Sequence, residues 1–194
     1  MSDYATIILA SASPRRSELM ALAGITCLVV PADICEDLLP GEQPEEHVMR
    51  LSHEKAQAVS ATAAGRFFIG ADTVVVLDDR IMGKPADEEQ AFEMLTSLSG
   101  QTHVVITGIT VTDREKGTFL SRSVRTEVLF KKLTDREIRD YIASGCPMDK
   151  AGAYAIQGGA VHFIRSISGS YTNVIGLPMT ELYELLQDMQ ALPK

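Results

Sequence analysis

A serine-proline-arginine stretch near the start of the chain carries groups that suit phosphate chemistry. Residues Ser11–Arg16 read Ser-Ala-Ser-Pro-Arg-Arg and follow a short apolar run that is typical of a buried strand. Ser13 can cap a helix that begins at Pro14, where the missing N–H costs nothing. Arg15 and Arg16 then fall in the first turn, where the helix dipole disfavours cations. Two interpretations stay open: both arginines hold a bound anion with free N–H groups, or they are solvated or paired with acids.

One carboxylate interrupts an otherwise uncharged run. Asp72 stands in the middle of Phe67–Leu77, whose other residues are all compatible with a strand. A carboxylate buried there is costly unless it is paired, protonated or bound to a metal. Gly70 predicts a bulge or a break in the strand at this point. Asp72 is therefore either a functional carboxylate or part of a turn between two strands.

Two lysines are further candidate cations. Lys55 lies on the inner stripe of a helix predicted over residues 45–64. Its ammonium either reaches the rim of the core or points at a buried anion. Lys84 stands between Gly83 and Pro85, which restrict the backbone, in a segment that lacks the pattern of a P-loop.

Two other segments have the composition of ligand loops. Asp33, Glu36 and Asp37 lie in a loop and are either solvated or facing a metal or a phosphate-bound cation. Residues 149–159 hold three glycines and three alanines around a charged pair. Such small residues imply that another backbone segment or a ligand approaches closely. The pattern G-x-G-x-x-G is absent, which argues against a dinucleotide site.

Composition restricts the classes of function. With 45% hydrophobic and 23% charged residues in 194, the chain is typical of a globular protein. Its net charge of −8 argues against a nucleic-acid-binding surface. We expect no signal peptide and no membrane span, since no long apolar run is present. The dispersed Cys27, Cys35 and Cys146 favour a reducing cytoplasm and argue against a disulfide framework or a structural zinc site.

Strands and helices alternate at first and strands dominate later, which predicts a mixed α/β sheet covered by helices. No internal repeat or linker is evident, so we expect a single domain over residues 1–194. A turn or ligand loop is expected at 169–176. The expected strands are 7–10, 26–30, 67–77, a return strand that starts at 81–82, 103–112, 119–133 and 161–167. The expected helices are 14–23, 45–64, 87–98, 135–144 and 178–189.

In order and spacing, five motifs resemble the Maf family of nucleoside triphosphate pyrophosphatases over nearly the whole chain. The resemblance implies an α/β fold of the inosine-triphosphate-pyrophosphatase type, with a mixed twisted sheet flanked by helices and two lobes around a central cleft. It also implies a divalent cation, Mg or Mn, and homodimers. The motifs are Ser11–Arg16, Gly70–Thr73, Gly83–Pro85, Asp149–Tyr154 with Gln157-Gly158, and Gly176–Pro178.

The resemblance also implies roles for individual residues. Asp72, Lys55 and Lys84 are the expected catalytic residues, and Asp72 with Glu36 is the expected metal site. Cys35 departs from the family pattern, because many relatives have a second acid at this position. The expected first shell of the metal therefore lacks that acid here. The expected substrate-binding residues are Ser13, Arg15, Arg16, Thr73 and Gln157.

Three of those positions separate two substrate groups of the family. Arg15, Thr73 and Gln157 match the group that acts on dTTP and UTP, whereas the group that acts on 7-methyl-GTP has Trp, Gln and Glu there. We expect hydrolysis of the α–β phosphoanhydride, with unusual pyrimidine nucleotides as further substrates. The alternative is a nucleotide-binding regulator of cell division with little turnover.

Overall fold

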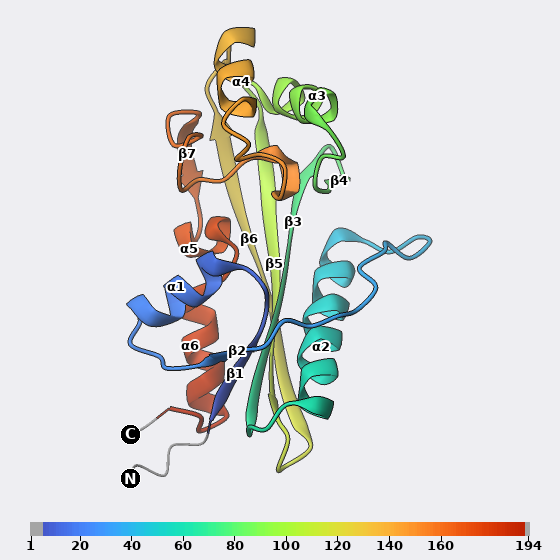
Figure 1. Cartoon of the computed structure of the whole chain (residues 1–194), viewed down its shortest axis with the longest axis vertical. Coiled ribbons are helices and arrows are strands. Elements are labelled where there is room, and N and C mark those ends of the chain that lie inside the picture. Colours follow the sequence, from blue (N-terminus) through green and yellow to red (C-terminus); the bar gives the residue numbers. More distant parts are fainter. Residues whose placement is uncertain (1–5, 193–194) are drawn as a thin grey trace. The chain divides into compact units, whose positions relative to one another are not determined.

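The protein is built on a seven-stranded sheet with parallel and antiparallel pairs. The computed structural model describes residues 6–192 (Figure 1). The strands are β1 (Ile7–Ala10), β2 (Leu28–Val29), β3 (Phe67–Leu77), β4 (Arg80–Met82), β5 (Thr102–Asp113), β6 (Thr118–Phe130) and β7 (Ile164–Ser168). Their order is β2-β1-β3-β5-β6-β7, with β4 paired to β3. β1 runs parallel to β2 and β3, whereas the β3–β4 and β6–β7 pairs are antiparallel.

Helices flank the sheet, which confirms the predicted mixed α/β class. Among residues 6–192, none of the helices has the length and apolar character of a membrane-spanning segment. The α-helices are α1 (Pro14–Leu22), α2 (Pro44–Thr62), α3 (Glu88–Leu98), α4 (Asp135–Ile142), α5 (Tyr171–Ile175) and α6 (Met179–Asp188), and a 3₁₀ turn, η1, covers Ala151–Ala153.

The described residues divide into two compact units. The first unit comprises residues 6–72, 107–124 and 176–192, and the second comprises residues 73–106 and 125–175. The chain passes from one unit to the other within β3, β5 and β6. The prediction of a single domain over the whole chain stays a prediction.

In the first unit, α2 lies against the sheet more closely than a side chain allows. A Cβ at Gly70 of β3 would be 1.9 Å from the Ser52 carbonyl oxygen, and one at Gly108 of β5 would be 2.3 Å from that of Val48. β3 is continuous through Gly70, which pairs in register with Ala10 of β1. The predicted bulge or break is therefore wrong, because the glycine is needed for the close approach of the helix.

The inner face of α2 confirms the stripe expected from the sequence, including Lys55. Ala56 and Val59 from this helix pack with Ile8, Ala10 and Phe68 in the core of the first unit. Figure 1 shows α2 on one side of the strands of this unit and α1 with α6 on the other. The buried residues of α2 are His47, Val48, Leu51, Ser52, Lys55, Ala56 and Val59.

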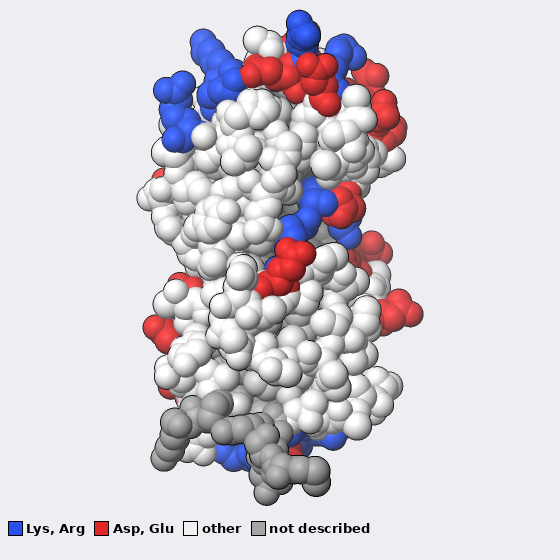
Figure 2. All heavy atoms as spheres, turned by 60° about the vertical axis from the view of Figure 1, so that its left-hand side comes forward, with Lys and Arg blue, Asp and Glu red and all other residues white. Residues whose placement is uncertain are grey.

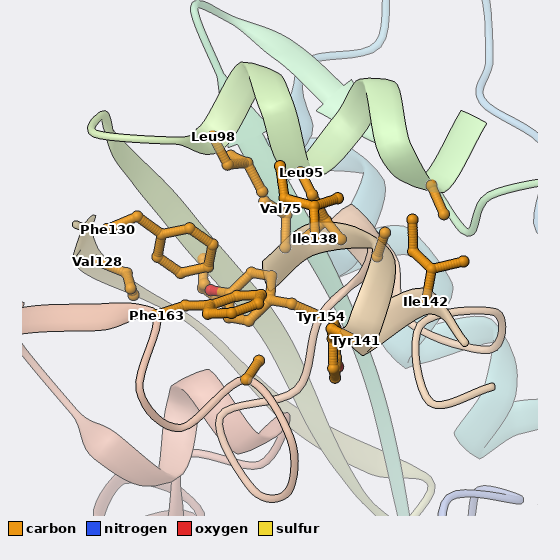
Figure 3. Close-up of a cluster of buried hydrophobic side chains, with 14 residues drawn as sticks. Val75, Leu95, Leu98, Val128, Phe130, Ile138, Tyr141, Ile142, Tyr154 and Phe163 are labelled. Carbon is orange, nitrogen blue, oxygen red and sulfur yellow. The ribbon is translucent and has the colours of Figure 1, made fainter. Parts of the chain in front are cut away.

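The second unit has a separate core that is rich in aromatic rings (Figure 3). The rings of Phe130 and Tyr154 meet edge to face, with centroids 4.8 Å apart. His103 is buried beside them, and its Nε2 lies 2.8 Å from the Tyr154 hydroxyl. Edge-to-face packing of this kind adds to the free energy gained from burial alone.

The segment after β7 is a helix and not the predicted loop. Residues 171–175 form α5, where the sequence predicts a turn or a ligand loop. The Ser170 hydroxyl accepts a hydrogen bond from the Asn173 N–H at 3.2 Å, as in a helix cap. The Asn173 amide is buried and donates to the Val105 carbonyl at 3.1 Å and to the Thr126 hydroxyl at 2.9 Å. These contacts give Asn173 a structural role in the second unit.

Candidate functional site

The turn between β1 and α1 presents a helix N-terminus that no acid neutralises locally. Ser13 occupies the N-cap position with an extended backbone, and Pro14 is the first helical residue. The position of Ser13 is as predicted, but within the described residues its side chain makes no capping hydrogen bond. Its N–H donates instead to the Ser11 hydroxyl at 3.2 Å. The first turn contains no acidic residue, so its positive end is available to an anion.

Arg16 connects three segments of the first unit. Its Nε donates to the Gly176 carbonyl at 2.8 Å, and its Nη1 donates to the Ala71 carbonyl at 2.8 Å and to the Ser11 hydroxyl at 3.1 Å. Desolvation of the half-buried guanidinium lowers the pKa of Arg16, and the nearby Asp72 carboxylate opposes this effect. Arg16 therefore fixes the backbone immediately before Asp72, in addition to placing a positive charge there. Arg15 is half-buried in the same turn.

Lys55 bridges two carboxylates from different elements. Its Nζ lies 2.7 Å from Asp72 Oδ1 on β3 and 2.6 Å from Glu36 Oε1 in the loop before α2. The Asp72 side chain is 11% exposed and that of Glu36 is 48% exposed. Lys55 thus points at a buried anion, which decides between the two interpretations of its place on the stripe. Three of the predicted site residues meet in this group, which we call the Lys55 cluster.

The chemistry of the Lys55 cluster fits a divalent cation that also binds substrate. Mg²⁺ in nucleotide enzymes is commonly held by one or two carboxylates, with phosphate oxygens and water completing the shell. Asp72 and Glu36 supply two such oxygen donors that converge on one cationic position. Over residues 6–192 there is no group of three or more His, Cys, Asp or Glu side chains arranged to hold a metal by themselves. A metal here would therefore complete its shell with substrate oxygens and water.

Cys35 takes no part in the Lys55 cluster. This is the position where the resemblance leads one to expect a second acid. The exposed thiol donates to Asp37 Oδ2 at 3.1 Å. Glu36 is the loop acid that the structure brings to Lys55.

The glycine-rich segment 149–159 and the segment around Lys84 lie side by side in the second unit. The Gly152 N–H donates to the Gly83 carbonyl at 3.0 Å. Gly152 has a φ of 65°, and a Cβ there would be 2.9 Å from the Val75 side chain. A neighbouring chain segment therefore explains the small residues of this stretch. Lys84 itself is exposed.

The remaining predicted residues also belong to the second unit. Thr73 is partly buried and directly follows Asp72 on β3. Gln157 is exposed in the turns after η1. Structure thus brings Arg16, Lys55, Glu36 and Asp72 together within the first unit, while Thr73, Lys84 and Gln157 lie in the second.

Two charged residues near the Lys55 cluster are not evident from the sequence. Arg50 of α2 and Glu42 of the preceding loop form an ion pair of 2.5 Å between Nε and Oε1. The sequence pattern does show the i,i+4 pair of Arg50 with Glu54, which the structure places at 3.1 Å. Glu42 lies in a loop eight residues before Arg50, so no helical periodicity in the sequence indicates this pair.

The chain is similar to known proteins over almost its full length. A family model described as Maf-like protein matches residues 6–189. The chain is 58% identical over 187 residues to a dTTP/UTP pyrophosphatase of Geobacter sp. (strain M21), covering 96% of this chain and 97% of that protein. It is 47% identical over 188 residues to a dTTP/UTP pyrophosphatase of Shigella boydii serotype 4 (strain Sb227), covering 96% and 94%.

A solved structure shows a similar fold at much lower identity. It is that of a HAM1 protein from Coxiella burnetii, with a TM-score of 0.51, 14% identity, and coverage of 94% of this chain and 98% of that one. This likeness concerns the fold alone. The family model and the relatives extend across the segments that carry the Lys55 cluster and the motif Ser11–Arg16. The chain belongs to the family of Maf-like proteins.

Proposed function

We propose that this protein is a nucleoside triphosphate pyrophosphatase that hydrolyses dTTP and UTP to the monophosphate and pyrophosphate, clearing them from the nucleotide pool. Relatives at 47–58% identity bear the name dTTP/UTP pyrophosphatase. The observation that carries the proposal is the Lys55 cluster, where a buried carboxylate and a loop carboxylate meet one lysine. A carboxylate held in this way next to a cationic helix N-terminus suits attack on a phosphoanhydride.

The cations of the chain would bind the triphosphate. With a net charge of −8, the protein as a whole repels such a substrate, so the positive charge has to be local. Figure 2 shows charged side chains in small groups on the face it presents, rather than as one broad basic surface. Ser13 and the N–H groups of the first turn of α1 donate to phosphate oxygens. Arg15, Arg16, Lys55 and Lys84 neutralise the charge that develops on the leaving pyrophosphate.

Asp72 is the proposed catalytic carboxylate. In the step we propose, a water oxygen attacks the α-phosphorus, the bond from this phosphorus to the bridging oxygen breaks, and pyrophosphate leaves with that oxygen. Asp72 orients this water by accepting a hydrogen bond from it and then accepts its proton. Lys55 places a positive charge 2.7 Å from Asp72 Oδ1 and orients this carboxylate by a charge-assisted hydrogen bond.

Asp72 and Glu36 are the residues that would hold a Mg or Mn ion. Such an ion, when bound, polarises phosphate oxygens and favours ionisation of the attacking water. Lys55 then keeps both carboxylates within reach of the substrate, at 2.6 and 2.7 Å from its own Nζ.

Specificity for pyrimidines is assigned to Arg15, Thr73 and Gln157. Their side chains offer donors and acceptors that pair with the edge of thymine or uracil. A base that leaves such polar groups unpaired is rejected, because an unmade hydrogen bond costs more than a made one gains. Modified uridine triphosphates with the same edge are further candidate substrates.

The proposal also covers the cellular location and the oligomeric state of the enzyme. The exposed Cys35 and Cys146 and the partly exposed Cys27 are free thiols, which suits a cytoplasmic protein. A homodimer is also proposed, and light scattering during gel filtration checks it. A mass of one 21.1 kDa chain would contradict the dimer without affecting the activity.

A panel of nucleoside triphosphates tests the function. The protein is incubated with each nucleotide and Mg or Mn, and the products are separated by chromatography. We expect monophosphate and pyrophosphate from dTTP and UTP, and slower turnover of purine nucleotides. Release of single phosphate, or no turnover of either pyrimidine nucleotide, would overturn the proposal. Tight binding with negligible hydrolysis at saturating metal would favour the regulator of cell division, which the names of the relatives do not favour.

A further inference from the structure

The loop that carries Glu36 has little buried surface to hold it in place. It runs from Pro31 to Glu42, and most of its residues, including Cys35 through Gly41, are exposed. Glu36 nevertheless lies 2.6 Å from the Lys55 ammonium. A segment with so few buried apolar contacts opens easily unless polar contacts fix it. The position of Glu36 therefore depends on specific anchors.

Arg50 of α2 supplies such an anchor. Its Nε donates to Glu42 Oε1 at 2.5 Å, and its Nη2 donates to Glu42 Oε2 at 2.8 Å. The same Nη2 donates to the Asp37 carbonyl at 3.1 Å, one residue beyond Glu36. Paired bonds between a guanidinium and a carboxylate fix the angle as well as the distance, which a lysine does not do.

Glu42 is itself held on several sides. Its side chain is 7% exposed, and its Oε2 also accepts from the Leu39 N–H at 3.1 Å and contacts His47 Nδ1 at 2.9 Å. The Arg50 guanidinium keeps the pKa of Glu42 well below its usual range, so the pair is ionised throughout the working range of pH. Glu42 thus closes the loop from Leu39 onward against α2.

α2 connects this pair to the Lys55 cluster. Arg50 and Lys55 lie five residues apart on the helix, and they contact the neighbouring loop residues Asp37 and Glu36. The helix is fixed to the sheet by the close approach at Gly70, two residues before Asp72. One rigid element therefore sets both where Asp72 meets Lys55 and where the loop delivers Glu36.

We propose that the Arg50–Glu42 pair is a positioning element of the active site, which holds the loop so that Glu36 stays beside Lys55 and Asp72. The proposal rests on the proposed function. Arg50 does not act on the substrate itself, because its Nε, Nη1 and Nη2 all donate to oxygens of Glu42, Glu54 and Asp37. Its effect on catalysis passes through the placement of Glu36.

The first experiment compares Arg50→Lys and Glu42→Gln with a matched control, Glu54→Gln. The control removes only the surface partner of Arg50, whose side chain is 39% exposed. Hydrogen exchange of the backbone amides of residues 31–42 is measured by mass spectrometry, together with kcat, KM and the Mg²⁺ concentration for half-maximal rate. For Arg50→Lys and Glu42→Gln we expect faster exchange in the loop. We also expect a rise of about tenfold in the Mg²⁺ requirement, as is typical when a residue that orients a ligand is lost.

A double-mutant cycle separates positioning from general stability. Glu36→Gln is combined with Arg50→Lys, and kcat/KM is measured for all four proteins. If Arg50 acts through Glu36, adding Arg50→Lys to Glu36→Gln produces little further loss. Multiplicative losses, or unchanged exchange in residues 31–42, would overturn the proposal. Failure of the unmutated protein to hydrolyse dTTP or UTP would instead overturn the proposed function, while the exchange measurement would still test the anchor.

Discussion

At the scale of single residues, Lys55 is a buried charge whose desolvation is offset by two carboxylates. A lysine on the buried face of a helix is unfavourable unless it meets an opposite charge. Asp72 on β3 meets it at 2.7 Å, and Glu36 adds a second carboxylate from a mostly exposed loop. Removing either charge of the buried pair leaves the other desolvated. Each residue therefore compensates the buried charge of the other.

We predict that Asp72→Asn folds but loses turnover. Asparagine keeps the shape of the side chain and removes the charge that, in the proposed mechanism, accepts a proton or holds a metal. Loss of a general base typically costs about 10² to 10⁴ in rate. Steady-state assays of dTTP hydrolysis measure the effect, and thermal unfolding checks that the fold is kept. Retained activity would mean that the chemistry lies on another carboxylate.

His103 gives a prediction about pH and stability. Burial lowers the pKa of His103 to about 4, below the usual histidine value of 6.5. The unfolded chain therefore takes up a proton at this residue before the folded chain does. The stabilisation is complete above pH 6.5 and declines as the pH falls towards 4. Between pH 7 and 5 this linkage amounts to about 2 kcal/mol.

Urea unfolding at pH 7 and pH 5 tests this linkage. The native protein is compared with His103→Gln, which cannot titrate in this range and still presents a polar group to the Tyr154 hydroxyl. We expect the variant to be less stable at pH 7 and to lose about 2 kcal/mol less on acidification. Equal losses in the two proteins would show that His103 does not carry the pH dependence.

At the scale of elements, two glycines allow α2 to lie directly on the sheet. Gly70 and Gly108 are on neighbouring strands, and a Cβ at either would overlap backbone atoms of the helix. Hydroxyls complete this contact, since Ser52 Oγ lies 2.9 Å from the Thr110 hydroxyl. The distance between helix and sheet in turn sets the reach of Lys55. The motif glycine before Asp72 thus has a packing reason that is independent of catalysis.

We predict that Gly70→Ala strongly destabilises the first unit. The new methyl group would be 1.9 Å from the Ser52 carbonyl oxygen, so α2 has to move. Overpacking of this kind costs about 3 kcal/mol, and more where backbone is displaced. Gly83→Ala is the matched control, because a Cβ there meets nothing within 4 Å. Chemical unfolding of both variants measures the difference, and similar stabilities would contradict the close approach.

At the scale of the whole molecule, the two units have separate cores but share strands. The aromatic core around Phe130 belongs to the second unit, and the core around Phe68 belongs to the first. β3, β5 and β6 each contribute residues to both units. When one part of a continuous strand unfolds, the rest of that strand loses pairing hydrogen bonds as well. The units are therefore expected to unfold together.

Phe130→Leu tests this cooperativity. The substitution removes aromatic contacts with Tyr154 and leaves a cavity, which costs about 1 to 3 kcal/mol. We expect one unfolding transition at a lower temperature, with hydrogen exchange accelerated equally in the cores of both units. Exchange that accelerates in the second unit alone would show that the two units are independent, and would argue against the single domain predicted from the sequence.

Much of the fold could be predicted from the sequence because it depends on local patterns. The strand expected at 7–10, the helix expected from Pro14 and the helix expected from residue 135 all begin where predicted, and Thr134 with Glu137 forms a capping box at the start of the last one. Such signals need only neighbouring residues. The turn or ligand loop predicted at 169–176 is instead the short helix α5, because its stability comes from buried contacts of Asn173 with distant residues.

The sequence by itself determined which residue types make up the candidate site and which family the chain resembles. It left open which of these residues contact one another. The choice between a rim position and a buried anion for Lys55 required knowing that Asp72 lies 17 positions away in sequence but 2.7 Å away in space. Only the tertiary structure shows that Arg16 binds the Ala71 and Gly176 carbonyls, and that Arg50 reaches the loop of Glu36. These contacts join segments with no common period. They depend on the packing of α2 on the sheet, which no local pattern encodes.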